Sequence, residues 1–305
     1  MSTEYIHFTA EQKEAARQTD LVALLQSQGE HLKRSGKEYV WRDGSEKVTV
    51  RGNLWFHQYE RIGGDAVDFV RRFYNMDFPQ AVNFLLGNNG GALPQAKPVK
   101  REPPKPFTLP PKNDNMRRVY AYLLNRRGID REVLSAFVHK GMIYESADYH
   151  NAVFVGYDEH GIALHAHKRG TGSESTYKGN AESCDPRYSF HWTGTDNTLY
   201  LFEAPIDMLS FISLHKENWR SHSYAAACCV GDQVLFQILK ANPNIDAVCL
   251  CMDNDTAGQA ANKRISDKLF IQGIKHEILV PEFKDWNEDL LCDEQEETEC
   301  QTLQL

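Results

Sequence analysis

In the last third of the chain, short apolar runs alternate with amphipathic stretches. The apolar runs have the length of strands and read TLYLF, SYAAACCV, AVCLCM and HEILV, and helix-like stretches such as PIDMLSFISLHK and AGQAANKRISDKLFIQG separate them. Continuous apolar strands with amphipathic helices between them are typical of a parallel sheet that helices cover on both faces. We therefore predict an α/β domain over residues 198–291.

The N-terminal part of the chain has a different pattern, in which helices flank a small sheet. Helical spacing or alternation predicts a helix over residues 19–28, strands over 39–41, 47–50 and 54–57, and helices over 65–74 and 78–86. These elements predict an α+β domain over residues 1–87, which is large enough to fold alone.

Proline and charge divide the rest of the chain. Residues 88–112 contain seven of the twelve prolines, which predicts an extended linker. Residues 113–197 are expected to form a third domain with two helices and a hairpin, in which the loop GTGS lacks the spacing of a Walker A loop. Residues 292–305 hold five acids and no base, so we expect a frayed acidic tail.

The overall net charge of −8 argues against a nucleic-acid partner, but the charge is unevenly distributed along the chain. The net charge is −1 over residues 1–90, +3 over 91–199 and −10 over 200–305. Within the middle third, residues 97–131 carry ten basic side chains against three acids. No apolar run is long enough to cross a bilayer and no signal peptide is evident, so a cytoplasmic protein without a membrane partner is expected.

Acidic residues follow three of the predicted parallel strands. Glu203 follows the first strand, with Asp207 four residues later; Asp253 and Asp255 follow the third, and Asp285 follows the fourth. Ligands gather at the carboxyl ends of parallel strands. Several carboxylates at one sheet edge repel one another unless a cation neutralises them, and oxygen ligands favour Mg²⁺ or Mn²⁺. A single DxD is weaker support, since such acids often cap the next helix.

This acidic pattern resembles a Toprim domain, the module shared by bacterial primases, topoisomerases and some nucleases. The resemblance implies that Glu203, Asp253 and Asp255 are catalytic, and that these three bind the metal with the help of Asp207 and Asp285. One departure is that Ala204 stands where the family usually has glycine.

The first 87 residues are similar to the zinc-ribbon domain of bacterial replicative primases, through TDLVALLQSQGEHLKRSGKEYVW and GGDAVDFVRRFYNMDFPQAVNFL. The ligand pairs of that family align with WRDGSE and FHQYERIGG, where only His57 could bind a metal. A structural zinc needs four ligands, so we expect no zinc. Five aromatic residues would pack in its place: Tyr39, Trp41, Trp55, Phe56 and Tyr59. Alternatively, such residues, above all Trp41 and Trp55, would stack on single-stranded bases.

Residues 113–197 resemble the N-terminal half of the primase catalytic core, through YLLNRRGIDREVLSAF, NAVFVGYDEHGIALHAHKRG and STYKGNAE. By position, Lys168, Arg169 and Lys178 would hold template and nucleotide phosphates. Weaker candidates for the same role are Arg117, Arg118, Arg126 and Arg127. We interpret His165 and His167 as polar residues on one face of a strand rather than as metal ligands.

Together, the resemblances imply a primase-like Toprim protein of a plasmid, phage or conjugative element. It would use Mg²⁺ or Mn²⁺ for nucleotidyl transfer on single-stranded DNA, with nucleotides and replication or conjugation proteins as partners. Two alternatives stay open: a Toprim nuclease, because the same acids serve hydrolysis, and a non-catalytic DNA-binding or regulatory protein that has kept the fold. A topoisomerase is disfavoured, since none of the 13 tyrosines has a recognisable strand-attacking context.

Overall fold

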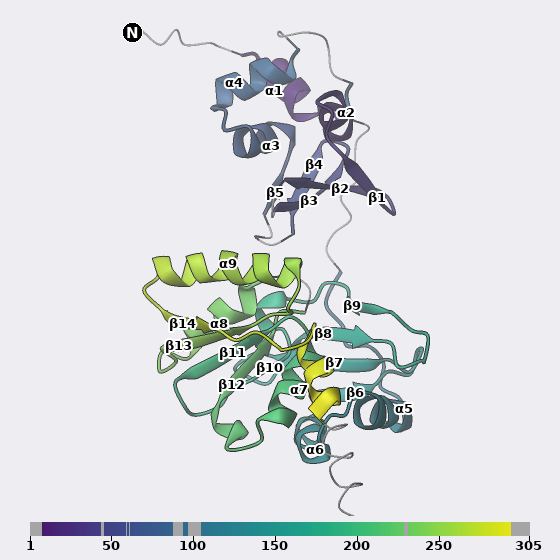
Figure 1. Ribbon diagram of the computed structural model, residues 1–305. Helices are drawn as coiled ribbons and strands as arrows, with labels where there is room; N and C mark the ends of the chain where they lie inside the picture. Colours follow the sequence, from purple (N-terminus) through teal and green to yellow (C-terminus); the bar gives the residue numbers. More distant parts are fainter. Residues whose placement is uncertain are drawn as a thin grey trace, which may run out of the picture. The chain divides into compact units, whose positions relative to one another are not determined.

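The computed structural model forms two compact units, Met1–Pro103 and Pro104–Leu305 (Figure 1). The residues that it describes are 8–43, 46–58, 60, 62–87, 94–96, 105–228 and 231–293. The predicted acidic tail therefore lies almost wholly outside the described residues.

The first unit consists of an antiparallel sheet with two helices before it and two after it. Its helices are α1 (Ala10–Arg17), α2 (Leu21–Ser27), α3 (Ala66–Phe73) and α4 (Phe78–Leu85). Its strands pair in chain order as β1 (Leu32–Ser35), β2 (Glu38–Asp43), β3 (Glu46–Arg51), β4 (Leu54–His57) and β5 (Gly63–Gly64). Each of the four helices begins at a side-chain cap, namely Thr9, Asp20, Asp65 or Asp77. The elements α1, β1 and β5 had not been predicted.

Aromatic side chains fill the core of this unit. Trp41 and Trp55 are only 2% and 6% exposed. Both pack edge-on or tilted against Phe69 and Phe73, with ring centroids 5.2 to 6.1 Å apart. The prediction that these two tryptophans belong to the core is therefore confirmed, and the alternative that they stack on bases is wrong.

His57, the one metal-ligating residue predicted in this region, is buried in the same core. It is 1% exposed, and its ring stacks on that of Phe73 at 6.5 Å. Its Nδ1 accepts a hydrogen bond from the backbone N–H of Glu60 at 3.0 Å, which occupies this nitrogen. Residues 44, 45, 59 and 61, which align with zinc-ligand loops, lie outside the described residues.

The absence of zinc is a prediction that a chelator tests. Because aromatic packing rather than a metal would hold this unit, excess EDTA is expected to leave the unfolding midpoint of the full chain unchanged in guanidinium chloride. Metal analysis of the purified protein is the companion measurement. One equivalent of tightly bound zinc, or a lower midpoint in EDTA, would contradict the prediction.

Both ends of the predicted linker pair with the unit beside them. Pro94 accepts a hydrogen bond from Asp20 N–H at 2.9 Å, and the hydroxyl of Tyr144 donates one to Pro110 O at 2.6 Å. Lys112 forms a β-bridge with Ser146. Proline cannot donate through its nitrogen but its carbonyl still accepts, so these parts of the predicted linker make backbone contacts with the neighbouring elements.

The second unit contains two sheets. Its first part has the helical elements α5 (Arg117–Tyr120), η1 (Ala121–Arg126) and α6 (Arg131–His139), and an antiparallel sheet of β6 (Ile143–Glu145), β7 (Ala152–Tyr157), β8 (Ala163–Arg169) and β9 (Lys178–Asn180) in that order. The hairpin of β7 and β8 confirms the prediction, whereas the three-residue strands β6 and β9 had not been predicted.

The second sheet is mostly parallel, as predicted. Its strands have the order β10-β12-β11-β13-β14, and only β10 runs antiparallel to its neighbour. They are β10 (His191–Trp192), β11 (Thr198–Phe202), β12 (Ser223–Ala226), β13 (Ala247–Cys251) and β14 (Lys275–Ile278). The other elements are η2 (Pro186–Tyr188), α7 (Pro205–Leu214), η3 (Trp219–Ser221), α8 (Gln233–Ala241) and α9 (Thr256–Ile271).

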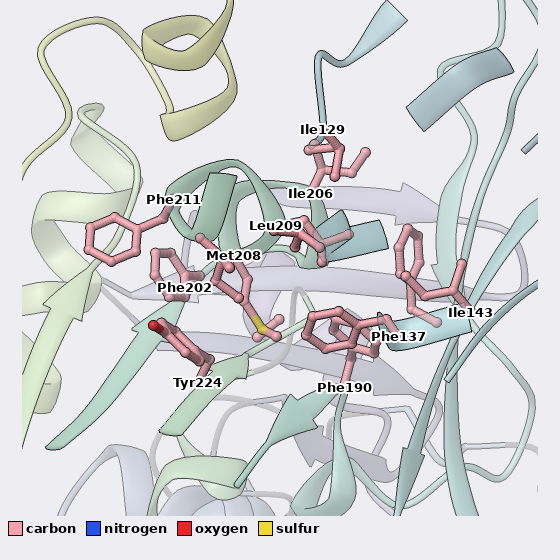
Figure 2. Packing of buried hydrophobic residues seen from close by; sticks show 14 of the residues in the cluster. Ile129, Phe137, Ile143, Phe190, Phe202, Ile206, Met208, Leu209, Phe211 and Tyr224 are labelled. Carbon is pink, nitrogen blue, oxygen red and sulfur yellow. The ribbon is translucent and has the colours of Figure 1, made fainter. Parts of the chain in front are cut away.

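Helices cover both faces of this parallel sheet. On one face, Phe202 and Tyr224 pack with Met208 and Leu209 of α7 and with Phe137 of α6, as Figure 2 shows. On the other face, Leu199, Leu201 and Val248 pack against α8 and α9. Residues 113–197 and 198–291, predicted as separate domains, thus share one core. No helix of the described residues is long and apolar enough to cross a membrane.

Candidate active site at the carboxyl ends of the parallel strands

The acidic residues meet at one edge of the parallel sheet because of its register. Phe202 at the end of β11 pairs with Cys251 at the end of β13, so the residues that follow these strands emerge side by side. Glu203 follows β11 directly, Asp253 comes two residues after β13, and Asp207 lies in the first turn of α7. Asp285 reaches the same place from the segment after β14.

These four carboxylates and four cations line one cavity of about 170 Å³. The cations are Arg127, Arg169, Lys178 and Lys284. Lys178 is the first residue of β9, and Arg169, its partner in the sheet register, is the last residue of β8. The antiparallel sheet thus brings positive side chains to the acids of the parallel sheet, a combination suited to phosphate groups with a bound cation.

Burial and mutual repulsion raise the pKa values of three carboxyl groups in this cavity, those of Asp253, Asp207 and Glu203. Burial, and then the charges of Glu203, Asp285 and Asp255, raise the pKa of Asp253 to about 7. Burial, and then the charges of Asp253, Asp285 and Glu203, hold the pKa of Asp207 well above its ordinary value. The pKa of Glu203 is raised by burial, and Lys178 opposes this increase.

The cavity fits a divalent cation in its donor chemistry. Oδ1 of Asp253 is buried without a hydrogen-bond partner among the described residues, and clustered carboxylates with raised pKa values gain from a nearby positive charge. Within the described residues, no three carboxylate, histidine or cysteine side chains lie close enough together to hold a metal. Mg²⁺ commonly keeps several waters and uses only one or two carboxylates, so it does not need such a triad.

Asp255 has a structural contact that sequence reasoning set aside. Its Oδ1 accepts hydrogen bonds from the backbone N–H groups of Ala257 and Gly258, at 2.9 and 2.8 Å, and so caps α9. It does not line the cavity, although its charge still acts on Glu203 and Asp253. A metal-binding role for Asp255 stays a prediction. Because Oδ1 caps the helix, Oδ2 would be the atom that binds the metal.

Two small residues, Gly258 and Ala204, lie next to the acidic residues in space or in sequence. A Cβ atom at Gly258 would lie 2.0 Å from the carbonyl oxygen of Asp253, so glycine lets the first turn of α9 approach the strand end. Ala204, where the family usually has glycine, has φ −133° and ψ 159°. Any residue adopts this extended conformation, so the departure requires no compensation.

The predicted basic residues fall into two groups. Arg169 and Lys178 line the acidic cavity, whereas Lys168 and Arg118 line a different cavity. Successive residues of a strand point to opposite faces, which separates Lys168 from Arg169. Arg117 is exposed at the start of α5.

Sequence reasoning missed two residues, Asn287 and Tyr122, that hold cations of the acidic cavity in place. Asn287 is 2% exposed and accepts a hydrogen bond from Arg127 Nη1 at 2.8 Å. The hydroxyl of Tyr122 accepts one from Arg127 Nε and one from Arg169 Nε, at 3.0 and 3.3 Å. These contacts hold two of the cations in place. They join residues up to 160 positions apart, so no local pattern marks them.

His167 also lines this cavity, although we had predicted only a polar residue on a strand face. It is 2% exposed, and His165 on the same face is fully buried. Burial lowers the pKa of His167 to about 4, and the charges of Arg169 and Lys178 add to the effect. Asn180 donates to Cys228 O at 3.1 Å, so its Oδ1 accepts from His167 Nδ1–H at 2.7 Å. The Nε2 atom of the neutral ring is then a proton acceptor.

Comparison with known proteins agrees with this architecture. Residues 200–290 match a family described as Toprim-like, and residues 121–196 match one described as a protein of unknown function, DUF3991. Residues 200–290 are therefore a Toprim-like domain, which confirms the predicted fold of this region. The chain is also 25% identical over 274 residues to the uncharacterized protein pXO2-78 of Bacillus anthracis, covering 85% of this chain and 79% of that protein.

Several solved primase structures are similar to the chain. The zinc-binding and RNA polymerase domains of Aquifex aeolicus primase match with 16% identity and a TM-score of 0.41, covering 96% of this chain and 84% of that one. The primase fragment of the bacteriophage T7 primase-helicase protein matches with 19% identity and a TM-score of 0.43, covering 59% of this chain and 73% of that one.

Proposed function

We propose that the chain is a cation-dependent nucleotidyltransferase that joins nucleotides on single-stranded DNA. The observation that carries the proposal is the acidic cavity, where carboxylates of a Toprim-like domain meet cations of the antiparallel sheet. The similar Bacillus anthracis protein, pXO2-78, is a protein of plasmid pXO2. This similarity supports a role in replication or transfer of a plasmid or related element.

Glu203 and Asp253 would hold Mg²⁺ or Mn²⁺, with Asp207, Asp255 and Asp285 assisting. When bound, the cation supplies positive charge that stabilises the transferring phosphoryl group. Its presence would also account for Asp253 Oδ1, a buried oxygen without a hydrogen-bond partner among the described residues. The five carboxylates offer oxygen donors, which suit a hard cation such as Mg²⁺.

The other side chains would bind and orient the reactants. Lys178 contributes a point charge and Arg169 a fork of N–H donors, both suited to phosphate oxygens. Tyr122 and Asn287 hold Arg169 and Arg127 so that they lose little freedom when phosphate binds. Glu203 or His167 Nε2 would accept the proton of the attacking hydroxyl.

In the proposed reaction, a 3′-hydroxyl oxygen attacks the α-phosphorus of a nucleoside triphosphate. A new P–O bond forms, the bond to the β-phosphate oxygen breaks, and pyrophosphate leaves with the electron pair. The hydroxyl proton passes to the acceptor in the cavity, so atoms and charge balance without a further reactant.

The test is template-directed incorporation of labelled ribonucleotides on a single-stranded DNA template, with Mg²⁺ and with Mn²⁺. Products that require both template and cation support the proposal. No product with either cation overturns the polymerising activity. Nicking of supercoiled plasmid that disappears with Glu203→Gln, without incorporation, would replace it by the nuclease alternative.

Metal-free protein is expected to lose stability as the pH rises. The folded pKa of Asp253 is about 7, above its ordinary value of 3.8, so the folded state binds the extra proton. Its stabilising effect is complete below pH 3.8 and is lost as the pH rises toward about 7. At pH 8, Asp253→Asn should stabilise metal-free protein by on the order of 2 kcal/mol, because solvent screens part of the repulsion.

Thermal unfolding with EDTA and with Mg²⁺ measures this effect. Mg²⁺ should raise the melting temperature of the wild type and leave that of Asp253→Asn unchanged. Asp246→Asn, at an acid near the opposite end of β13, is the control and should still respond to Mg²⁺. Equal Mg²⁺ stabilisation of wild type and Asp253→Asn would exclude Asp253 as a ligand.

A further inference from the structure

A second cavity, of about 580 Å³, lies on the other face of β8 from the acidic site. Lys168 and Arg118 line it, together with Tyr149 and Tyr177. Its volume falls within the usual range for small-molecule sites, roughly 300–1,000 Å³. Lys168, which we predicted to hold template or nucleotide phosphate, lines this cavity and not the acidic one.

The two tyrosines present aromatic surface to solvent. Tyr149 is 88% exposed and Tyr177 is 45% exposed. Lys168 Nζ lies 5.7 Å from the centroid of the Tyr177 ring. An exposed aromatic ring beside a cation is the combination with which proteins stack a base and hold its phosphate.

The loop that carries Tyr149 is held in a strained conformation. Tyr149 and His150 both have positive φ, at 60° and 52°, in the region that favours glycine. The hydroxyl of Thr171 donates to His150 O at 2.8 Å, and that of Ser146 donates to Asp148 O at 2.6 Å. Such strain is typical of functional sites, and here the two hydrogen bonds fix the backbone on either side of Tyr149.

The loop between β8 and β9, residues 170–177, forms another wall of this cavity and is held by hydrogen bonds. Arg126 donates to the carbonyl oxygens of Gly172 and Ser173, both at 2.9 Å. A Cβ atom at Gly170 would lie 1.9 Å from Ser175 Oγ, so the loop closes tightly there. Arg126, one of the weaker candidates for phosphate binding, thus braces one wall of this cavity, and both walls are formed before any ligand binds.

We propose that this cavity binds one nucleotide, its base against Tyr177 and Tyr149 and its phosphate on Lys168 and Arg118. Asp148, the one acid among the described residues that line the cavity, is available to the sugar hydroxyls or the base amino groups. The inference rests on the proposed function, and it adds a base-stacking subsite apart from the acidic cavity. The nucleotide is either part of a strand or free, and the experiment distinguishes these sources.

The experiment measures binding of fluorescein-labelled oligothymidylate and, separately, of ATP to the full chain in EDTA, where no phosphoryl transfer occurs. Tyr177→Ala and Tyr149→Ala should each weaken binding roughly 5- to 150-fold, and Tyr177→Phe should restore it. Lys168→Ala should reduce the salt dependence of oligonucleotide binding by about one unit of slope. As the control, Phe270→Ala removes another exposed ring, 79% exposed on α9, and should bind as the wild type does.

If the alanine variants lose affinity only for oligothymidylate, the site binds a nucleotide of a strand. If they lose affinity only for ATP, it binds a free nucleotide. Either result supports the site. Absence of binding to the wild type, or unchanged affinity in both alanine variants, overturns it. Glu203→Gln should bind normally while losing incorporation. A failure of the proposed function would therefore appear as absent incorporation with this binding intact.

Discussion

Substitution of Glu203 by glutamine is expected to lower the rate of template-directed incorporation roughly 100- to 10,000-fold, the range of general acid–base catalysis. The amide keeps the size of the side chain but carries no charge for the cation and accepts no proton. Folding should be retained, because burial and nearby acids already raise the pKa of Glu203 and removal of its charge relieves repulsion. Initial rates under saturating nucleotide give the measurement.

Glu217→Gln is the matched control, since Glu217 is exposed in the loop after α7. It should leave the rate unchanged. If Glu203→Gln retained the wild-type rate while circular dichroism showed it folded, Glu203 would have no role in the chemistry, and the acids near it would have to act alone.

Substitution of Glu145 by alanine should destabilise the second unit by about 3–5 kcal/mol, because it breaks a buried charged network. Glu145 is 1% exposed, and its Oε2 accepts from the backbone N–H groups of Arg118 and Val119 at 3.0 and 3.2 Å. Its Oε1 accepts from Asn113 Nδ2 at 2.8 Å and contacts His150 Nδ1 at 2.6 Å. Without it, the first N–H groups of α5 stay buried and unsatisfied.

Urea unfolding of the variant measures this loss. Glu182→Ala is the control, since the Glu182–Lys105 pair is 71% and 64% exposed and should contribute at most about 1 kcal/mol. A loss below that of the control would show that Glu145 does not anchor α5.

The pH dependence of Glu145 has the opposite sign to that of Asp253. Burial opposes its ionisation, but the hydrogen bonds from Val119, His150 and Asn113 outweigh it and lower the pKa. Its stabilising effect is therefore present above its ordinary value of 4.5 and is lost as the pH falls through the lower folded value.

The sequence predicted the acidic edge because parallel strands obey a simple rule. Near-continuous apolar strands fix the direction of β11 and β13, and the residues after Phe202 and Cys251 must then emerge together. The positions of Glu203 and Asp253 at this edge could therefore be predicted from the strand pattern alone. Asp207 followed because it lies one helical turn later, in α7.

Other parts of the site depend on contacts that the sequence does not display. The strand β9 has only three residues, so the pairing that places Lys178 opposite Arg169 has no pattern of its own. Arg127 depends on Asn287, far along the chain. The separation of Lys168 from Arg169 was predictable from strand alternation, which had already been applied to His165 and His167.

The most direct test of the account is the position of a bound cation. Crystals of the full chain soaked in Mn²⁺ should show an anomalous peak at the carboxylates of Glu203 and Asp253. The same soak of Asp253→Asn should show the peak weakened or lost. No peak in the wild type, or a peak held by other residues, would contradict the proposal that this acidic cavity is a metal-dependent active site.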